Sequence, residues 1–141
     1  MRIVKAWWLI SCALCLVGVA YAYQGPFREY PSVEYGVPPV PPDWQEKTEF
    51  VFARLMYPPG WNDGYRGRFD GDWRQGASLW TQDYPRADRD FTRAVRRLTR
   101  IHTRSVEQAV NLEDSDEVYN WPFLYAMQVG EWGLTDFQGK K

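Results

Sequence analysis

The sequence predicts an α/β protein with a mainly parallel sheet in three layers, of which the chain supplies an incomplete part. Residues 49–57 and 122–129 are apolar on both alternating faces, a pattern typical of strands covered by helices on each side. Residues 86–103, between them, have the period of an amphipathic helix. The order strand, helix, strand, strand favours parallel pairing through a helical crossover.

The first 22 residues have the pattern of a secretory signal peptide. Arg2 and Lys5 form a basic start, residues 6–22 carry no charge, and small residues precede a cleavage site between Ala22 and Tyr23. An uncleaved anchor is the alternative, because the apolar stretch approaches the roughly 18 residues that span a bilayer. The sequence therefore predicts export to the periplasm or the extracellular space, with membrane contact only through this segment if it stays uncleaved.

Both cysteines, Cys12 and Cys15, lie within the predicted signal peptide. Residues 9–12 resemble a lipoprotein cleavage box, but cutting there would leave an apolar mature N-terminus. Cleavage after Ala22 leaves a chain without thiols, which excludes disulfides, cysteine nucleophiles and thiolate metal sites. Without Arg2 and Lys5, 15 of the 17 basic residues remain against 18 acidic ones, and this weak negative balance argues against a nucleic-acid partner.

Residues 23–47 are predicted to be a proline-rich linker ahead of an α/β domain over residues 48–141. Prolines remove backbone donors and favour extended polyproline geometry, so the segment is interpreted as a semi-rigid spacer. Peptide docking on residues 38–42 is the alternative. The loop of residues 58–84 is rich in turn residues, and its Asp63, Asp70 and Asp72 do not have the spacing of an EF-hand calcium loop.

The helix of residues 86–103 is expected to begin after Pro85, with Asp83 or Asp88 as its cap. Its apolar side should face the core and its arginine side the solvent, although the arginines could also bind an anionic partner. The apolar side consists of Phe91, Ala94, Val95, Leu98 and Ile101. The arginine side consists of Arg89, Arg93, Arg96, Arg97, Arg100 and Arg104.

Residues 105–112 and 122–129 are the second and third predicted strands. Thr135 and Gln138 then form a capping-box pattern, which indicates the start of a further helix. A single long helix leaves one face of a sheet of such strands uncovered. We therefore expect missing strands, a protein partner or self-association to cover that face.

Four segments together carry a resemblance to a known family. WTQDYPRADRDF at 80–91, RLTRIHTRSVE at 97–107, YNWPFLYAMQVGEWGLTD at 119–136 and FVFARLMY at 50–57 resemble the bacterial secreted family called domain of unknown function 4159. The resemblance implies a class I glutamine amidotransferase-like, flavodoxin-like fold and no particular activity. Members of the family usually continue with a further helix and strand, so the resemblance covers only their N-terminal half.

No catalytic residue, metal or cofactor is predicted. The amidotransferase-like fold implies a cysteine nucleophile, which the mature chain lacks, and the single histidine, His102, is expected near a helix end. Ser78 and Thr81 have no histidine placed to activate them.

A ligand-binding site is expected where the loop of residues 58–84 meets the helix, because ligands of open α/β sheets bind beyond the carboxyl ends of the strands. Backbone donors and Arg89 would suit a carboxylate or phosphate, and aromatic rings would suit a sugar. Packing of the loop is the alternative role. The candidate residues are Trp80, Thr81, Asp83, Tyr84, Asp88 and Arg89.

The favoured hypothesis is a non-catalytic exported domain that binds a small anion, a glycan or an envelope protein partner covering the open sheet. One alternative is half of a hydrolase-like enzyme in which Asp83 and Asp88 act together. The other is an inactive truncated product.

Overall fold

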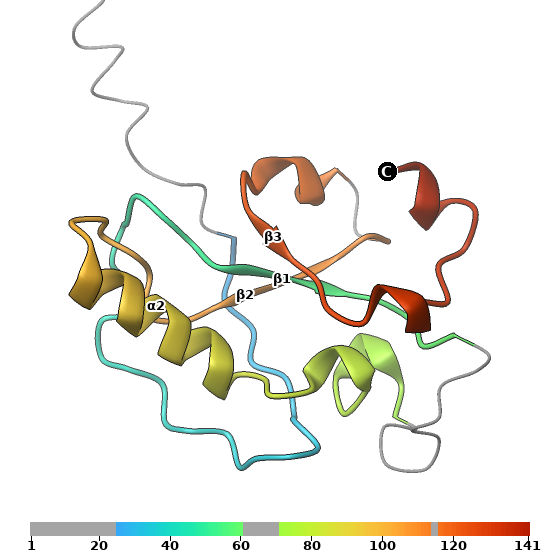
Figure 1. Ribbon diagram of the computed structural model, residues 1–141, viewed down its shortest axis with the longest axis horizontal. Helices are drawn as coiled ribbons and strands as arrows, with labels where there is room; N and C mark the ends of the chain where they lie inside the picture. The colour runs from blue at the N-terminus through green and yellow to red at the C-terminus, as the bar shows by residue number, and fades with distance from the viewer. Residues whose placement is uncertain (1–24, 61–70, 114–115) are drawn as a thin grey trace, which may run out of the picture.

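The computed structural model describes residues 25–60, 71–113 and 116–141. The predicted signal peptide of residues 1–22 and its cleavage site at Ala22 and Tyr23 lie outside the described residues, as do Asp63 and Asp70. Three strands form a parallel sheet in the order β2-β1-β3, with the helix α2 packed against it (Figure 1). Within the described ranges, no helix is both long enough and apolar enough to cross a membrane.

The strand β1, Ala53–Met56, is the centre of the sheet. Residues 51–57 are all buried, as expected for a run that is apolar on both faces. The strand β2, Gln108–Asn111, pairs with β1 in parallel, with Ala53 opposite Gln108. Because α2 lies between these two strands in the chain, the predicted parallel pairing through a helical crossover is confirmed.

The strand β3, Leu124–Tyr125, is shorter than the predicted strand of residues 122–129. It pairs in parallel with the other side of β1, so it is an edge strand of the described sheet, and both of its residues are at least partly exposed. Gln128 has a left-handed backbone (φ 49°) and is followed by the 3₁₀ helix Val129–Glu131. The prediction of a long strand buried on both faces is therefore wrong here, because the chain turns away soon after Tyr125.

The helix α2, Arg86–Leu98, ends earlier than predicted, because Thr99 is extended and its hydroxyl binds the carbonyl of Val95. Neither Asp83 nor Asp88 caps α2 through its side chain. Pro85 precedes the first helical residue, and Ala87 N donates to the main-chain oxygen of Asp83. The predicted helix is confirmed over residues 86–98, but its predicted caps and C-terminal end are wrong.

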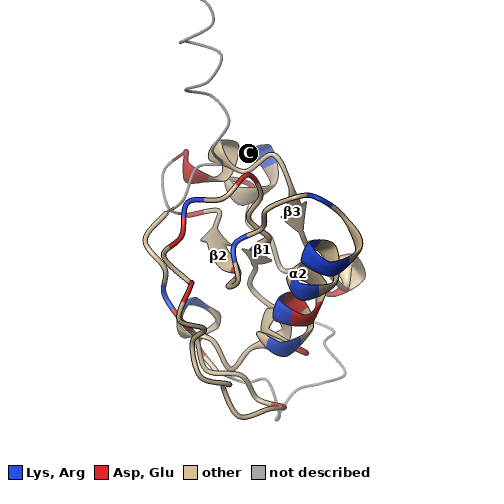
Figure 2. Ribbon diagram, turned by 90° about the vertical axis from the view of Figure 1, so that its left-hand side faces the viewer, with Lys and Arg blue, Asp and Glu red and all other residues tan. Residues whose placement is uncertain are grey.

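The side of α2 that faces the rest of the protein is polar. Asp88, Arg89 and Thr92 are its buried residues, whereas Phe91 is 44% and Leu98 84% exposed. Figure 2 shows basic residues along the length of α2. The expectation of a buried apolar side and a solvated arginine side is wrong, because Asp88 and Arg89 have buried ionic partners described below.

Residues 25–47, expected to form a spacer, lie against the domain. Tyr30 is buried in the main core cluster, where its ring meets Trp80 edge-on at 5.3 Å between centroids. Further along the segment, the carbonyl of Pro31 accepts a hydrogen bond from Ala77 N at 2.8 Å. The difference arises because aromatic side chains between the prolines find apolar partners, so the extended backbone follows the protein surface.

The capping box predicted from Thr135 and Gln138 is formed. Thr135 N donates to Gln138 Oε1 at 2.8 Å, and Gln138 N donates to Thr135 Oγ1 at 3.3 Å. The 3₁₀ helix Gln138–Lys140 follows. The spacing of Thr135 and Gln138 thus predicted this reciprocal pair of hydrogen bonds correctly.

Candidate functional site

Arg54 and Asp88 form a buried ion pair between β1 and α2. Arg54 Nε and Nη2 lie 2.8 and 2.5 Å from the two carboxylate oxygens of Asp88, and the two side chains are 2% and 1% exposed. Arg54 Nη1 donates to the main-chain oxygens of Trp80 and Gln82 at 2.9 and 3.2 Å. All three guanidinium nitrogens are therefore satisfied within the protein.

A second buried pair connects α2 with the approach to β2 and with the N-terminal segment. Arg89 Nε donates to Glu107 Oε2 at 3.0 Å, and its Nη2 donates to Glu29 Oε1 at 2.6 Å. The remaining nitrogen, Nη1, donates to the carbonyl of Pro38 at 2.9 Å. Arg89 thus holds the proline-rich segment, α2 and the strand region together.

The pKa of Asp88 predicts an unusual pH dependence of stability. Burial raises its pKa from 3.8 to about 6, although Arg54 opposes the shift. Below the unfolded-state pKa of 3.8, the neutral Asp88 carboxyl makes its full contribution to the free energy of unfolding. That contribution is lost as the pH rises through the folded-state pKa of about 6. At about 1.36 kcal/mol per pKa unit, that loss is about 3 kcal/mol.

Asp88→Asn cannot ionise, so we expect its free energy of unfolding, relative to the wild type, to rise by about 3 kcal/mol between about pH 3 and pH 8. Chemical denaturation across this range measures the difference. Asp90→Asn, at an exposed position of α2, is the control and should show no such trend. If the stability of Asp88→Asn relative to the wild type does not change with pH, or decreases as the pH rises, the raised pKa of Asp88 is contradicted.

Five of the six predicted site residues are buried and have partners inside the protein. Trp80 Nε1 donates to the carbonyl of Trp73 at 2.7 Å, and Thr81 Oγ1 donates to that of Ser78 at 2.6 Å. The Tyr84 hydroxyl accepts a hydrogen bond from Tyr30 N. Burial is the main cause that raises the pKa of Tyr84 and the nearby Glu107 is the second, so the hydroxyl stays protonated. The buried residues are Trp80, Thr81, Tyr84, Asp88 and Arg89.

Asp83, the sixth, is partly exposed and has a left-handed backbone (φ 57°). Its amide donates to Glu34 Oε2 at 2.9 Å, whereas the Asp88 carboxylate is held by Arg54. The two acids therefore make separate contacts, and the geometry does not join them as a catalytic pair. Of the six residues, Arg89 lines the cleft described below.

The other residues considered for chemistry also have local roles. Asp72 accepts a hydrogen bond from Arg74 N and caps the 3₁₀ helix Trp73–Gln75. His102 lies beyond the end of α2, half exposed, with Nε2 3.4 Å from Glu46 Oε2. Among the described residues, no three His, Cys, Asp or Glu side chains lie together as a metal site would require.

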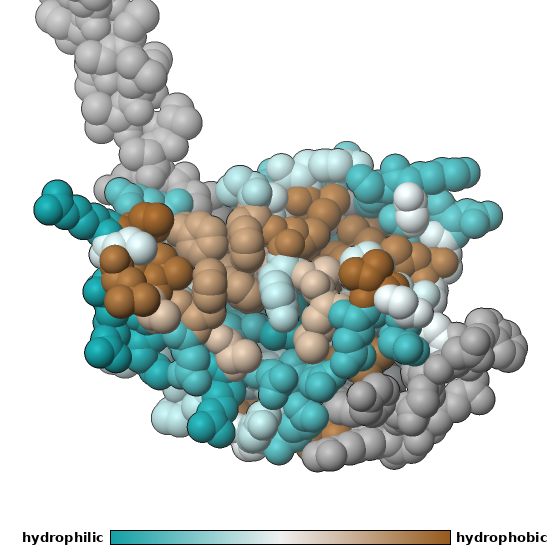
Figure 3. Space-filling model, in the orientation of Figure 1, coloured by the Kyte–Doolittle hydropathy of each residue, from teal (hydrophilic) through white to brown (hydrophobic). Residues whose placement is uncertain are grey.

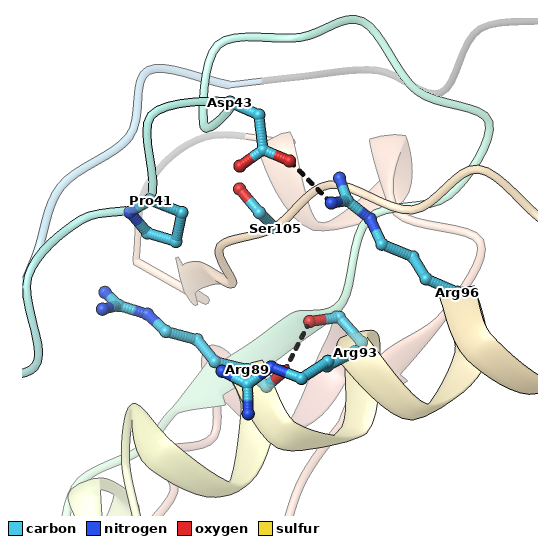
Figure 4. Close-up of a pocket in the computed structure, with 7 residues that line it drawn as sticks. Pro41, Asp43, Arg89, Arg93, Arg96 and Ser105 are labelled. Atoms are coloured by element: carbon cyan, nitrogen blue, oxygen red, sulfur yellow. Dashed lines mark hydrogen bonds and ion pairs between the residues drawn. The ribbon is translucent and has the colours of Figure 1, made fainter.

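An arginine-lined cleft lies between α2 and the proline-rich segment. A cavity of about 180 Å³ is lined by Pro41, Asp43, Arg89, Arg93 and Arg96, among others (Figure 4). A larger hollow of about 500 Å³ shares Pro41, Arg89 and Arg93 with it and adds Tyr35 and Arg86 among its walls. We call these two connected hollows the arginine cleft.

The arginine cleft has unused cationic hydrogen-bonding capacity. Arg96 Nη1 lies 2.6 Å from Asp43 Oδ2, and its Nε donates to the carbonyl of Thr103. Its Nη2 is buried and has no partner within the described part of the chain. Figure 4 shows Arg96 reaching from α2 toward Asp43. The hydrogen bond from Arg96 lowers the pKa of Asp43, so this wall stays charged at neutral pH.

Arg93 provides the accessible charge of the arginine cleft. Its side chain is 67% exposed and lies 2.6 Å from Asp90 one helical turn earlier. Exposed pairs of this kind are worth only about 0.2–1 kcal/mol, so an incoming anion can displace Asp90 at small cost. Arg89 is already paired with Glu29 and Glu107, and Arg96 is paired with Asp43. The exposed Arg86 and Arg93 are therefore the cations that an incoming anion can reach in this cleft.

The sequence reading anticipated only one wall of this cleft. The arginine run of the helix indicated an anionic partner as an alternative, and Arg93 and Arg96 belong to that run. The opposite wall, with Pro41 and Asp43, comes from the segment predicted to be a spacer, and no local pattern shows that it folds back onto α2. Comparisons of the chain with protein-family models, curated proteins and solved structures gave no match.

Proposed function

We propose that this protein is an exported, non-catalytic domain that binds a small oxyanion, such as a phosphate or carboxylate group, in the arginine cleft. The observation that carries the proposal is that two residues of one cavity wall have cationic donors to offer: Nη2 of Arg96 is buried without a partner among the described residues, and the guanidinium of Arg93 is accessible. A buried donor without a partner costs about 1–3 kcal/mol, and an anion at this position would recover that cost.

The chemistry of the walls supports an anion over the other ligands considered. Guanidinium groups present N–H donors in a planar fork that matches carboxylate and phosphate oxygens. Tyr35 stands at the rim with Arg86 5.4 Å from its ring centre, so an anion with an attached ring or sugar would also find a surface to contact. Membership of the family called domain of unknown function 4159 remains part of the proposal, and the β1-α2-β2 crossover supports it.

Calorimetric titration with phosphate and with sulfate, at constant ionic strength, tests the proposal. We expect saturable binding by the wild type and a weakening of at least about tenfold for Arg93→Ala, because a hydrogen bond to a charged group is worth about 1.5–3 kcal/mol. Arg93 is exposed, so its replacement should leave the fold intact. The melting temperature should rise with anion concentration, since a ligand at about 100 times Kd adds about 2.7 kcal/mol.

Arg97→Ala is the matched control, because Arg97 lies on α2 at an exposed position outside the arginine cleft. It should bind phosphate as the wild type does. If neither anion gives binding heat beyond a chloride reference of equal ionic strength, the proposal fails. Equal weakening in Arg93→Ala and Arg97→Ala would also overturn it, since that result indicates general screening.

A further inference from the structure

A second cavity lies on the other side of α2, next to β3, and aromatic rings form most of it. Its volume is about 180 Å³, and its aromatic walls are Phe52, Phe91, Phe123 and Tyr125. Phe91 comes from α2, Phe52 precedes β1, and Phe123 and Tyr125 come from the region of β3. We call this cavity the aromatic clamp.

Three rings of the aromatic clamp surround a common space. Phe91 and Phe123 are parallel within 6°, with centroids 6.5 Å apart. Phe52 lies 5.2 and 5.5 Å from these two rings. Carbon atoms pack best at about 3.5–4.0 Å, so a flat ring stacked between two others needs about 7–8 Å. Phe91 and Phe123 must therefore move apart by about 1 Å to admit one.

The polar groups of the aromatic clamp favour a neutral ligand. Arg54 and Asp88 also border the cavity, but they are paired with one another, and every guanidinium nitrogen of Arg54 has a partner. A charged ligand would therefore lose its hydration without gaining a counter-charge. The volume is slightly larger than the roughly 150 Å³ of a cavity known to hold benzene, so one ring fits.

The rings are accessible from outside. Phe123 is 37% and Tyr125 36% exposed, and Figure 3 shows apolar side chains gathered in a band across this face of the molecule. Large apolar side chains left at a surface in this way commonly mark a binding site. The arginine cleft uses a different side of α2, so this second site is independent of the anion proposal.

We propose that the aromatic clamp binds a free, neutral small molecule with a single flat aromatic ring. The ring stacks between Phe91 and Phe123 above Phe52. We assign the site to a free small molecule because such a molecule fits inside the cavity as a whole, whereas a polypeptide would leave its backbone outside a volume of about 180 Å³.

Binding of p-cresol, toluene and methylcyclohexane to the full chain, followed by NMR chemical-shift changes, tests this proposal. The two aromatic probes should bind with similar affinity, and methylcyclohexane, which matches toluene in size but is not flat, at least several-fold more weakly. Phe123→Ala should weaken p-cresol binding about tenfold. Phe137→Ala, a 62% exposed phenylalanine outside the cavity, should leave it unchanged.

Three results would overturn the proposal. Equal affinity for toluene and methylcyclohexane would indicate nonspecific binding to an apolar surface. Equal effects of Phe123→Ala and Phe137→Ala on p-cresol binding would place the bound ring elsewhere. An Ala87→Leu variant narrows the cavity without removing a ring, so it should also reduce p-cresol binding. Tighter binding of N-acetylphenylalaninamide than of toluene would assign the site to a polypeptide side chain.

Discussion

Arg54→Met is expected to lower the free energy of unfolding by about 3–5 kcal/mol, because it removes one partner of a buried ion pair. Methionine is long enough to fill most of the space, so the loss reports mainly the Asp88 carboxylate, which is left buried without its cation. The carbonyls of Trp80 and Gln82 lose their donor in the same variant. Urea denaturation near pH 7 measures the effect, with Arg97→Met at an exposed site of α2 as the control.

The double variant Arg54→Met/Asp88→Leu separates the cost of an unpaired charge from the loss of packing. Replacement of a whole buried pair by apolar groups is often neutral or stabilising. We therefore expect the double variant to recover most of the stability that Arg54→Met loses. A double variant as unstable as the single one would show that the pair contributes through its geometry and not through charge balance.

Tyr30→Ala is expected to cost about 3–5 kcal/mol, the range for removal of a buried aromatic side chain. Tyr30 packs edge-on against Trp80, and its amide donates to the Tyr84 hydroxyl at 3.4 Å. The result tests directly whether the proline-rich segment belongs to the folded domain. Thermal unfolding followed by near-ultraviolet circular dichroism would report the loss of aromatic packing.

Tyr35→Ala, in the same segment, is the matched control, because Tyr35 is 41% exposed. It should change the free energy of unfolding by no more than about 0.5 kcal/mol. If Tyr30→Ala is as mild as Tyr35→Ala, the segment behaves as the spacer that its proline content indicates.

The centre of the sheet could be predicted from the sequence because its signal is local. Residues 51–57 form one continuous apolar run, and β1 lies within it. The one exception in the run, Arg54, was visible in the sequence. Its role was not, because its partner Asp88 is 34 residues away and no periodic pattern links the two.

Which face of α2 is buried could not be predicted from the sequence, although the helix itself could. Periodicity shows that two faces differ, and the usual rule buries the apolar one. Here Arg89 and Glu107, 18 residues apart, satisfy one another inside the protein, which removes most of the cost of burying them. The apolar side, with Phe91, therefore contributes to the accessible aromatic clamp.

The wall of the arginine cleft that Pro41 and Asp43 form could not be predicted from the proline content of their segment. Proline content describes the stiffness of a backbone, but it does not determine what the side chains between the prolines contact. Asp43 meets Arg96 at 2.6 Å across 53 residues of sequence. Such a contact depends on the completed fold, so only coordinates reveal it.

One helix separates the two proposed sites, with Arg93 and Arg96 on one side and Phe91 on the other. A shared element couples two sites when each ligand favours the same one of its positions. If an anion favours one position of α2, an aromatic ligand that favours the same position will bind more tightly in its presence. Thermodynamic reciprocity then requires the aromatic ligand to strengthen anion binding by the same factor.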